Sequence, residues 1–488
     1  MWKTRLKSLW LPISIFAIIT IPLLVLLPDH ELPTADPSSF LPQRIPHVDH
    51  TALMKGPYDT PQQVTARCLE CHDKSDDQVM RSSHWTWEHE PVLVPGRTER
   101  VKGGKKNVIN NFCIGVAGNW EGCTGCHAGY GWKDDSFDFS DNRNVDCLVC
   151  HEQTGTYVKG KAGLPVDGVD LLASAKSVAF PSRSNCGSCH FGGGGGDAVK
   201  HGDLDSSLYF PSDDVDIHMG KHDMVCTDCH RTESHKISGR ALSVSMDNTA
   251  QVSCIDCHSE TLHQDQRINQ HTSTVACQTC HIPEVATRSA TKTHWDWSQA
   301  GDNEREENEG YKKIKGEFKY ANNLKPEYLW FSGTAQRHLY GDKINRDGAT
   351  DLNYPNGDIN NPHAKIFPFK VHSAKQIYDK QYQHLLQPKT YGETGYWKTF
   401  DWDSAVQQGS DITGLAYSGE FGFTETLMYW PQTHMVQAAS RALQCRDCHN
   451  ETANDKAGRL NWKALGYAGD PIRWGSRKLT ADMQGSEK

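Results

Sequence analysis

Eight copies of one cysteine and histidine pattern dominate the chemistry that this sequence can carry. Each copy has two cysteines three positions apart and a histidine directly after the second, and together they use sixteen of the 17 cysteines. The cysteine pairs are Cys68 and Cys71, Cys123 and Cys126, Cys147 and Cys150, Cys186 and Cys189, Cys226 and Cys229, Cys254 and Cys257, Cys277 and Cys280, and Cys445 and Cys448, followed by His72, His127, His151, His190, His230, His258, His281 and His449. Two thiols on one helical turn reach the two vinyl groups of a haem, and the next imidazole ligates its iron. The pattern predicts eight covalently bound c-type haems.

A tetrahedral zinc site is the alternative chemistry for paired cysteines with histidines. Here the histidine always follows the second cysteine directly, which haem attachment requires and zinc does not. Haem also accounts for the composition, because only 37% of the 488 residues are hydrophobic and porphyrins would supply much of the missing apolar interior.

Short helices that carry the motifs, joined by long loops, are the expected way of positioning these ligands. The loops are rich in Gly, Asp and Asn, and five glycines stand together at residues 192–196. This glycine run permits either close backbone approach or a flexible surface loop. The expected fold class is therefore mainly α with extensive irregular loops and little β, a multihaem cytochrome c fold packed around its haems.

Motif positions and composition divide the chain into five expected segments. They are an N-terminal membrane anchor or signal (1–28), a Pro-rich tether (29–50), a seven-haem array (51–284), a fold-back segment with distal ligands and the eighth haem (285–450), and a polar tail (451–488). Within the fourth segment a helix is expected near residues 435–443. A separate globular domain is the alternative for the stretch without motifs, residues 285–444.

The N-terminus favours export of the chain. Lys3, Arg5 and Lys7 precede an apolar run at residues 8–27, which is long enough to span a membrane. An uncleaved anchor in the inner membrane and a cleaved signal peptide are both open, and each leads to the periplasm.

The formal net charge of −9 disfavours nucleic acid as a partner. It also means that an anionic substrate would need a locally basic pocket.

Histidines are numerous enough to give most of the haems a second axial ligand. Of the 25 histidines, eight belong to motifs and three (His30, His47 and His50) lie in or near the tether, which leaves fourteen candidates. The expected distal ligands are His84 or His89, His201, His218, His235, His263 or His271, His372 and His434. The alternative for each of these residues is a histidine that lies at the surface or is held only by hydrogen bonds. For His218 and His222, four residues apart, a small metal site is a further alternative.

Two lysines and one cysteine stand close to the second and third motifs. Lys133 and Lys159 each follow a motif in an aromatic, glycine-containing setting, and a neutral lysine is able to ligate iron. A solvated surface lysine is the alternative for both. Cys113 lies outside every motif and is either a small buried hydrophobe or a reactive thiol near the second haem.

The sequence resembles the octahaem tetrathionate reductase family. The resemblance lies in the order of the motifs and in three stretches: Cys126 to Lys133 (CHAGYGWK), Thr154 to Lys159 (TGTYVK) and Val199 to Asp205 (VKHGDLD). The resemblance covers about residues 60–450. It implies a periplasmic reductase whose haems are bis-histidine relays except for the second, which has a lysine distal ligand in the substrate cavity. That haem maps onto Cys123, Cys126 and His127.

The resemblance leaves three points about the site open. No motif ends in lysine, which disfavours nitrite reductases with a proximal lysine, and a haem-linked tyrosine from residues 311–429 is not excluded. Lys133 lies six residues beyond His127, so it would have to cross the haem over a chain of at most about 20 Å. Lys159 arrives from the loop after the third haem and is favoured, with Lys133, another residue or none as alternatives.

The expected reaction is the reduction of tetrathionate to thiosulfate at the lysine-ligated haem, with Lys133, Lys159 or Lys200 supplying positive charge. Reduction of nitrite or hydroxylamine at the same haem and a non-catalytic electron conduit are the two alternatives. The expected partners are a small inorganic anion, a membrane quinol dehydrogenase or small periplasmic cytochrome as electron donor, and the membrane through the N-terminal helix. A homo-oligomer is left open.

Overall fold

The computed structural model describes residues 46–94, 97–112, 115–242, 244, 251–450 and 458–478. The anchor or signal at 1–28, most of the tether, Cys113 and part of the polar tail lie outside these residues. The chain forms two compact units: residues 42–253 with 273–488, and residues 254–272 with the first 41. No helix among the described residues is long and apolar enough to cross a membrane.

Short helices carry the cysteine motifs of the larger unit. The motif helices are α2 (Pro61–Leu69), α5 (Trp120–Cys123), α6 (Leu148–His151), α8 (Arg183–His190), α9 (Cys226–Cys229), α11 (Cys277–His281) and α14 (Cys445–Cys448). The other α-helices of this unit are α3 (Ser75–Met80), α4 (Ser83–Thr86), α7 (Leu171–Lys176), α12 (Tyr396–Thr399), α13 (Trp402–Thr413) and α15 (Pro471–Trp474). Because helices this short are unstable alone, their positions depend on loops, caps and packing.

The smaller unit carries the sixth motif. Its first cysteine begins a 3₁₀ turn, Cys254–Asp256, and α10 (Gln266–His271) follows. Asp265 caps α10 by accepting a hydrogen bond from the Arg267 amide at 2.8 Å. His263 is held by two hydrogen bonds to the Asn269 side chain, at 2.9 and 2.8 Å.

Cys71 and Cys257 correct the expectation that both cysteines of a motif lie on a helix. Helix α2 ends at Leu69, so Cys71 lies in the turn that follows it, and the 3₁₀ turn of the sixth motif ends one residue before Cys257. The physical reason is that haem attachment needs only one turn. That turn is kept, because the amides of His72 and His258 donate to the carbonyls four residues earlier, at 3.0 and 2.9 Å.

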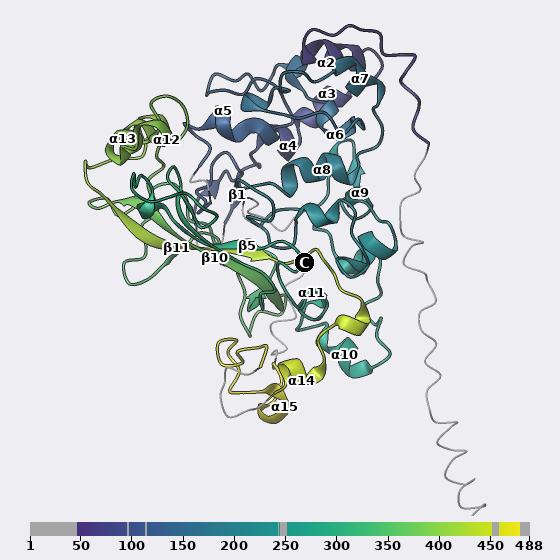
Figure 1. The fold of residues 1–488 in the computed structure, drawn as a ribbon. Coiled ribbons are helices and arrows are strands. Elements are labelled where there is room, and N and C mark those ends of the chain that lie inside the picture. Colours follow the sequence, from purple (N-terminus) through teal and green to yellow (C-terminus); the bar gives the residue numbers. More distant parts are fainter. Residues whose placement is uncertain are drawn as a thin grey trace, which may run out of the picture. The chain divides into compact units, whose positions relative to one another are not determined.

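A seven-stranded mixed sheet organises the segment between the seventh and eighth motifs (Figure 1). Its strands are β5 (Thr291–Asp296), β6 (Tyr311–Lys312), β7 (Gly316–Ala321), β8 (Glu327–Phe331), β9 (Thr350–Asp351), β10 (Lys365–Asp379) and β11 (Phe421–Pro431). The order is β6-β7-β5-β10-β11-β9, with β8 also paired to β10. The long pair β10 and β11 is antiparallel with Phe369 opposite Pro431, whereas β5 runs parallel to β10. Two small hairpins, β1 (Val92–Leu93) with β2 (Arg100–Val101) and β3 (Thr232–Glu233) with β4 (Lys236–Ile237), complete the strands.

This sheet corrects the expectation of little β structure, and the residues of β10 explain the error. Its even-numbered positions from Ile366 to Gln376 are buried, but they include Lys370, His372 and Gln376. Polar residues on the inward face hide the alternation by which a half-buried strand is recognised. The helix expected near residues 435–443 is also wrong, because only a single 3₁₀ turn, Ala439–Arg441, forms there.

The buried polar residues of β10 bind backbone of the motif segment. Lys370 donates from Nζ to the carbonyls of Val199 and Lys200 at 3.0 and 2.7 Å. Gln376 donates from Nε2 to the carbonyl of Asn110 at 3.0 Å. These contacts satisfy polar groups that would be costly to bury alone, and they join the sheet to the loops around the motifs.

One hydrophobic cluster contains residues from the motif segment and from the sheet. Phe112 and Val199 pack there with Trp295, Trp430 and other sheet residues. The sheet and these loops therefore share one core.

Asn119 attaches the loop before the second motif to residues 388–391. It is 2% exposed, and its Oδ1 accepts hydrogen bonds from the amides of Thr390 and Tyr391 at 2.7 and 3.0 Å. We expect Asn119→Ala to lower the free energy of unfolding of the holoprotein by about 2–4 kcal/mol, since buried backbone donors lose their acceptor. Denaturant unfolding followed by tryptophan fluorescence measures this, with exposed Asn303→Ala as the control. Equal stability of the two variants would contradict the assignment.

Candidate functional site

Four pairs of imidazoles lie at the separation that one shared iron imposes. A histidine nitrogen binds a first-row metal at about 2 Å, so two rings on one iron have centroids roughly 6 Å apart. The observed centroid distances are 6.2 Å for His50 and His72, 6.2 Å for His84 and His190, 6.3 Å for His151 and His235, and 6.2 Å for His230 and His434. Each pair combines one motif histidine with one from elsewhere in the chain. The geometry fits bis-histidine haem.

Hydrogen bonds at Nδ1 orient several of these rings. His151 and His230 donate from Nδ1 to the carbonyls of Ala179 and Ser238, at 2.9 and 2.8 Å. His235 Nδ1 lies 2.8 Å from Oε1 of Gln78, and His50 Nδ1 lies 2.7 Å from the carbonyl of Val48. A hydrogen bond donated from Nδ1 keeps the ring proton on Nδ1, and the lone pair of Nε2 is then available to bind a metal.

The pair of His50 with His72 includes a residue that sequence reasoning set aside. His50 follows a proline-rich stretch and was grouped with the tether. The useful signal was its position 22 residues before the first motif histidine, outside the proline run itself. The structure places it opposite His72, and its neighbour His47 lies 5.0 Å from it, ring to ring.

The His50 assignment predicts a change at one haem. We expect His50→Ala to remove one bis-histidine low-spin signal from the EPR spectrum of the oxidised holoprotein, because the first iron loses an axial ligand. His47→Ala is the matched control, since His47 is exposed and adjacent. An unchanged His50→Ala spectrum, or an equal change in His47→Ala, would contradict the pairing.

The other predicted distal ligands occupy varied places. His201 packs against Trp430 with centroids 4.8 Å apart, and burial lowers its pKa to about 4. His218 is the second residue of a π-helical turn, Ile217–Lys221, and its Nδ1 lies 3.8 Å from Asp216 Oδ1. His372 is fully buried on β10, where its Nδ1 donates to Asn111 Oδ1 at 2.9 Å. Their ligand roles stay predictions, as do those of His263 and His271 in the smaller unit.

Two further motif histidines of the larger unit, His281 and His449, also bond through Nδ1. His281 Nδ1 lies 3.4 Å from the Gln437 carbonyl, and His449 Nδ1 lies 2.7 Å from Asp470 Oδ1. In the smaller unit His258 follows its 3₁₀ turn, with its backbone amide donating to Cys254.

Cysteines of different motifs contact one another. The thiol of Cys68 lies close enough to that of Cys147 for the two to shift each other's pKa, and the same holds for Cys126 with Cys189 and for Cys186 with Cys226. The first motif therefore lies beside the third, the second beside the fourth, and the fourth beside the fifth, so haems held there would be close neighbours. The second motif thus borders the fourth.

The two motif cysteines that lie beyond a helix end differ in exposure. Cys71 is exposed, whereas Cys257 is partly buried. Each amide donates to the carbonyl of the first cysteine of its own motif, Cys71 to Cys68 at 3.2 Å and Cys257 to Cys254 at 3.3 Å. The local turn therefore places the two cysteines of each motif side by side, and haem attachment at Cys71 and Cys257 stays a prediction.

His127 of the second motif differs from the histidines just described. It is fully buried, and its Nε2 donates to the carbonyl of Trp85 at 2.6 Å. Five aromatic rings surround it with centroids 4.9 to 6.1 Å away: Trp85, Trp87, Trp132, Phe137 and Phe139. Burial lowers its pKa to about 3, and the charges of Lys159 and Lys105 act in the same direction. In this orientation Nε2 carries a proton and is turned to a carbonyl.

Lys159 lies beside the backbone of this motif. Its side chain is 5% exposed, and Nζ donates to the carbonyl of Gly129 at 3.1 Å and to that of His127. Asp146, with a fully buried side chain, forms an ion pair with Nζ at 2.8 Å. The cation therefore sits within the motif loop and not in solvent.

A tight loop after the third motif holds Lys159 in place. Val166 donates from its amide to the Val158 carbonyl at 2.9 Å, and Gly131 donates to the Ala162 carbonyl at 2.8 Å. Gly163 has φ +73°, and a Cβ there would lie 2.5 Å from the Gly129 carbonyl oxygen. Glycine is required at this close approach, which brings the loop against the second motif.

Two tyrosines complete a buried network around Asp146. Tyr130 donates from its hydroxyl to Oδ1 of Asp146 at 2.9 Å, and Tyr157 donates to the same carboxylate at 3.1 Å. Burial and the Asp146 charge raise the pKa of both phenols. Both tyrosines therefore stay protonated and act as hydrogen-bond donors.

The other residues predicted for this site are placed differently. Lys133 is exposed, although Trp132 beside it is buried in the aromatic cage of His127. Lys200 and Lys105 both act electrostatically on the sulfur of Cys126. Sequence reasoning missed Lys105, whose Nζ lies 3.9 Å from the centre of the Trp87 ring. Its place in a basic run, residues 102–106, was the available signal.

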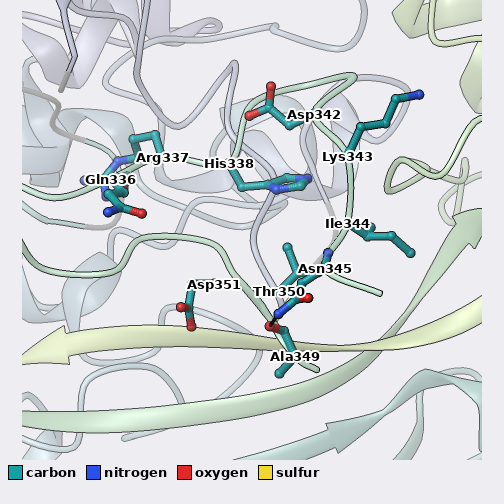
Figure 2. A pocket seen from close by; sticks show the side chains of 10 residues that line it. All are labelled: Gln336, Arg337, His338, Asp342, Lys343, Ile344, Asn345, Ala349, Thr350 and Asp351. Atoms are coloured by element: carbon teal, nitrogen blue, oxygen red, sulfur yellow. Dashed lines mark hydrogen bonds between the residues drawn. The ribbon is translucent and has the colours of Figure 1, made fainter. Parts of the chain in front are cut away.

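A cavity of about 460 Å³ lies apart from the described motif residues (Figure 2). Arg337, His338 and Asp342 line it from one loop, and Thr350 and Asp351 line it from β9. Burial lowers the pKa of His338 to about 4. None of the predicted haem ligands lines this cavity, so it is not the candidate site.

Comparisons with known proteins agree with a multihaem cytochrome. A family model described as "Cytochrome c bacterial" matches residues 292–452. The crystal structure of an octaheme cytochrome c from Shewanella oneidensis superposes with a TM-score of 0.82 and 47% sequence identity, covering 88% of this chain and 98% of that one. An uncharacterized protein of Archaeoglobus fulgidus is 25% identical over 240 residues, 39% of this chain and 80% of its own.

Proposed function

This chain belongs to the octahaem tetrathionate reductase family of multihaem c-type cytochromes, and we propose that it reduces tetrathionate to thiosulfate at its second haem. It is a c-type cytochrome that transfers electrons. We further propose that all eight motifs hold haem, that the protein works in the periplasm, and that a membrane quinol dehydrogenase or a small cytochrome reduces it.

The four imidazole pairs and the cysteine motifs are the residues that would hold the relay haems. When bound, each haem supplies an iron that gains or loses one electron. Two imidazoles on an iron leave no position for substrate, so these pairs suit electron relay. The protein positions the groups and tunes their potentials through ligands and burial.

One observation carries the catalytic assignment: Lys159 Nζ lies against the backbone of the second motif, where it donates to the carbonyls of Gly129 and His127. We propose that His127 and a neutral Lys159 would hold this haem. Its iron would then differ from those held by two imidazoles, and substrate would bind there.

The surrounding charges suit an anion. Lys105 and Lys200 both act on the sulfur of Cys126, so positive charge is concentrated at this motif in a chain of net charge −9. Low dielectric around buried groups strengthens attraction for a dianion. These lysines would hold tetrathionate while its central sulfur–sulfur bond accepts two electrons and breaks, which gives two thiosulfate ions and consumes no proton.

Nitrite or hydroxylamine reduction is a second candidate, and the network of Tyr130, Asp146 and Tyr157 favours it. Reduction of nitrite to ammonium consumes protons as well as electrons, and hydrogen-bonded phenols beside a carboxylate form a path for protons. A proton-coupled reaction slows as pH rises, whereas cleavage of tetrathionate has no proton in its balance.

Steady-state assays with reduced viologen test the proposal. We expect turnover of tetrathionate with a higher kcat/KM than for nitrite or hydroxylamine, and a rate that varies little across neutral pH. A higher kcat/KM for nitrite would assign the second candidate. No turnover of any of the three would leave an electron conduit and overturn the enzyme proposal.

A further inference from the structure

The segment after the eighth motif exposes two large apolar side chains. Ile472 and Trp474 are 72% and 66% exposed, and both belong to α15. Tryptophan is enriched at the energetic centres of protein interfaces. Both residues lie within four positions of Asp470, whose side chain is hydrogen-bonded to His449, the predicted iron ligand of the eighth motif.

One buried carboxylate connects α15 to the eighth motif. Asp470 is 6% exposed, and its Oδ1 accepts hydrogen bonds from His449 Nδ1 at 2.7 Å and from the Ile472 amide at 3.0 Å. Trp462 stacks on the His449 ring, with the two ring centroids 5.3 Å apart. The predicted haem ligand is therefore one side chain away from the exposed helix.

The charge of this segment is opposite to that of the whole chain. Its described residues, 441–450 and 458–478, contain seven Arg or Lys and two Asp. Both aspartates are occupied internally: Asp470 by His449, and Asp447 by the Gln444 amide at 2.7 Å. Among the described residues of this segment, the exposed charged side chains are basic: Arg441, Arg446, Lys463, Arg473 and Lys478.

The loop before β10 contacts the end of this segment and carries one exposed acidic residue. Arg477 donates to the carbonyls of Ile359 and Ala364 at 2.8 and 2.9 Å, which ties the end of the segment to the loop before β10. From that loop, Asp358 acts on Arg477 and is exposed. The exposed charge near α15 is thus predominantly basic on a molecule whose net charge is −9.

We propose that α15 and the basic residues around it form the docking surface for an acidic soluble electron-carrier protein, which delivers electrons to the haem of the eighth motif. This inference rests on the proposed haem at that motif. An apolar centre with a basic rim suits a transient complex steered by opposite charge. The transfer moves one electron from the reduced carrier to a ferric iron and moves no atom.

An onward path begins at the same motif. The backbone amide of Leu443, two residues before Cys445, donates to the carbonyl of Cys280 in the seventh motif at 3.0 Å, so the two attachment sites are close. An electron that arrives at the eighth haem could therefore pass on to the haem of the seventh motif. An anionic membrane surface would also attract basic and aromatic residues, but it would give no reason for the direct hydrogen-bonded link to His449.

Stopped-flow reduction of the holoprotein by reduced flavodoxin, an acidic one-electron carrier, tests the proposal. Trp474→Ala and the double variant Lys463→Glu/Arg473→Glu are compared with wild type. We expect each to lower the second-order rate constant by roughly ten-fold or more at low ionic strength, and added salt to remove most of the difference for the double variant. Phe210→Ala and Lys398→Glu, which change exposed residues elsewhere, should leave the rate unchanged.

The same samples separate this proposal from the proposed function. Reduction by excess dithionite counts the haems and checks that each variant is folded, and viologen-driven turnover of tetrathionate reports the catalytic site alone. Flavodoxin rates that are equal in wild type and both variants would overturn the docking surface whatever the turnover. Binding of wild type, lost in the variants, to phosphatidylglycerol vesicles with unchanged flavodoxin rates would overturn it in favour of a membrane contact.

Discussion

Replacing Lys159 with alanine is expected to lower viologen-driven tetrathionate turnover by roughly a hundred-fold or more, the effect of removing a group that builds the reacting site. The reason is that the second haem would lose the lysine ligand that sets it apart from the bis-histidine haems. The measurement is kcat/KM for tetrathionate in the purified holoprotein, together with its haem content. An EPR change confined to one haem should accompany the loss.

Lys133→Ala is the matched control for this prediction. Lys133 follows the same motif but is exposed, and so we expect turnover within about two-fold of wild type. Lys159→Arg adds a second comparison, since arginine keeps the positive charge but does not become neutral to ligate iron. Full activity in Lys159→Arg would show that charge alone is needed and would contradict ligation.

Replacing Asp146 with alanine is expected to lower the free energy of unfolding by about 2–4 kcal/mol, since two buried phenols lose the carboxylate that accepts their hydrogen bonds. Lys159 would lose the partner that positions it, so turnover should fall by roughly ten-fold or more. Denaturant unfolding and the viologen assay measure the two effects.

Asp146→Asn separates positioning from packing. It keeps the volume and one oxygen that accepts from the tyrosines, so we expect a smaller loss of stability than in Asp146→Ala. The double variant with Lys159→Ala should lose less stability than the sum of the two single variants, because the two side chains contact each other directly. Additive losses of stability would contradict a direct interaction between the two side chains.

The cysteine motifs and the family could be predicted from sequence, because the chemistry of haem attachment demands a contiguous pattern. Where each helix ends within a motif could not, as Cys71 and Cys257 show, since a single turn satisfies the same spacing. The loop that follows the helix and the packing of that loop set the helix boundary. The motif sequence does not determine it.

The distal ligands have no contiguous pattern. His84, His235 and His434 are among the predicted residues that the structure brings opposite a motif histidine, whereas His50 was set aside for its place after a proline-rich stretch. The pairing of a distal histidine with a motif histidine depends on the tertiary fold. Patterns in a single sequence carry no information about it.

The sheet was missed for a different physical reason. Hydrophobic alternation reports burial only where the buried face is apolar, and β10 buries Lys370, His372 and Gln376. Their partners are backbone and side-chain groups far away in sequence, such as Asn110 and Val199. The preference for Lys159 over Lys133 came from chain geometry. The structure adds the buried loop that positions Lys159 and the caged His127, which no spacing rule predicts.

The axial ligands of the second haem, seen in a crystal structure of the oxidised holoprotein, test the central proposal most directly. We expect Lys159 Nζ and His127 Nε2 to be bound to that iron. A second imidazole in place of Lys159, with Lys159 still paired to Asp146, would contradict the proposal.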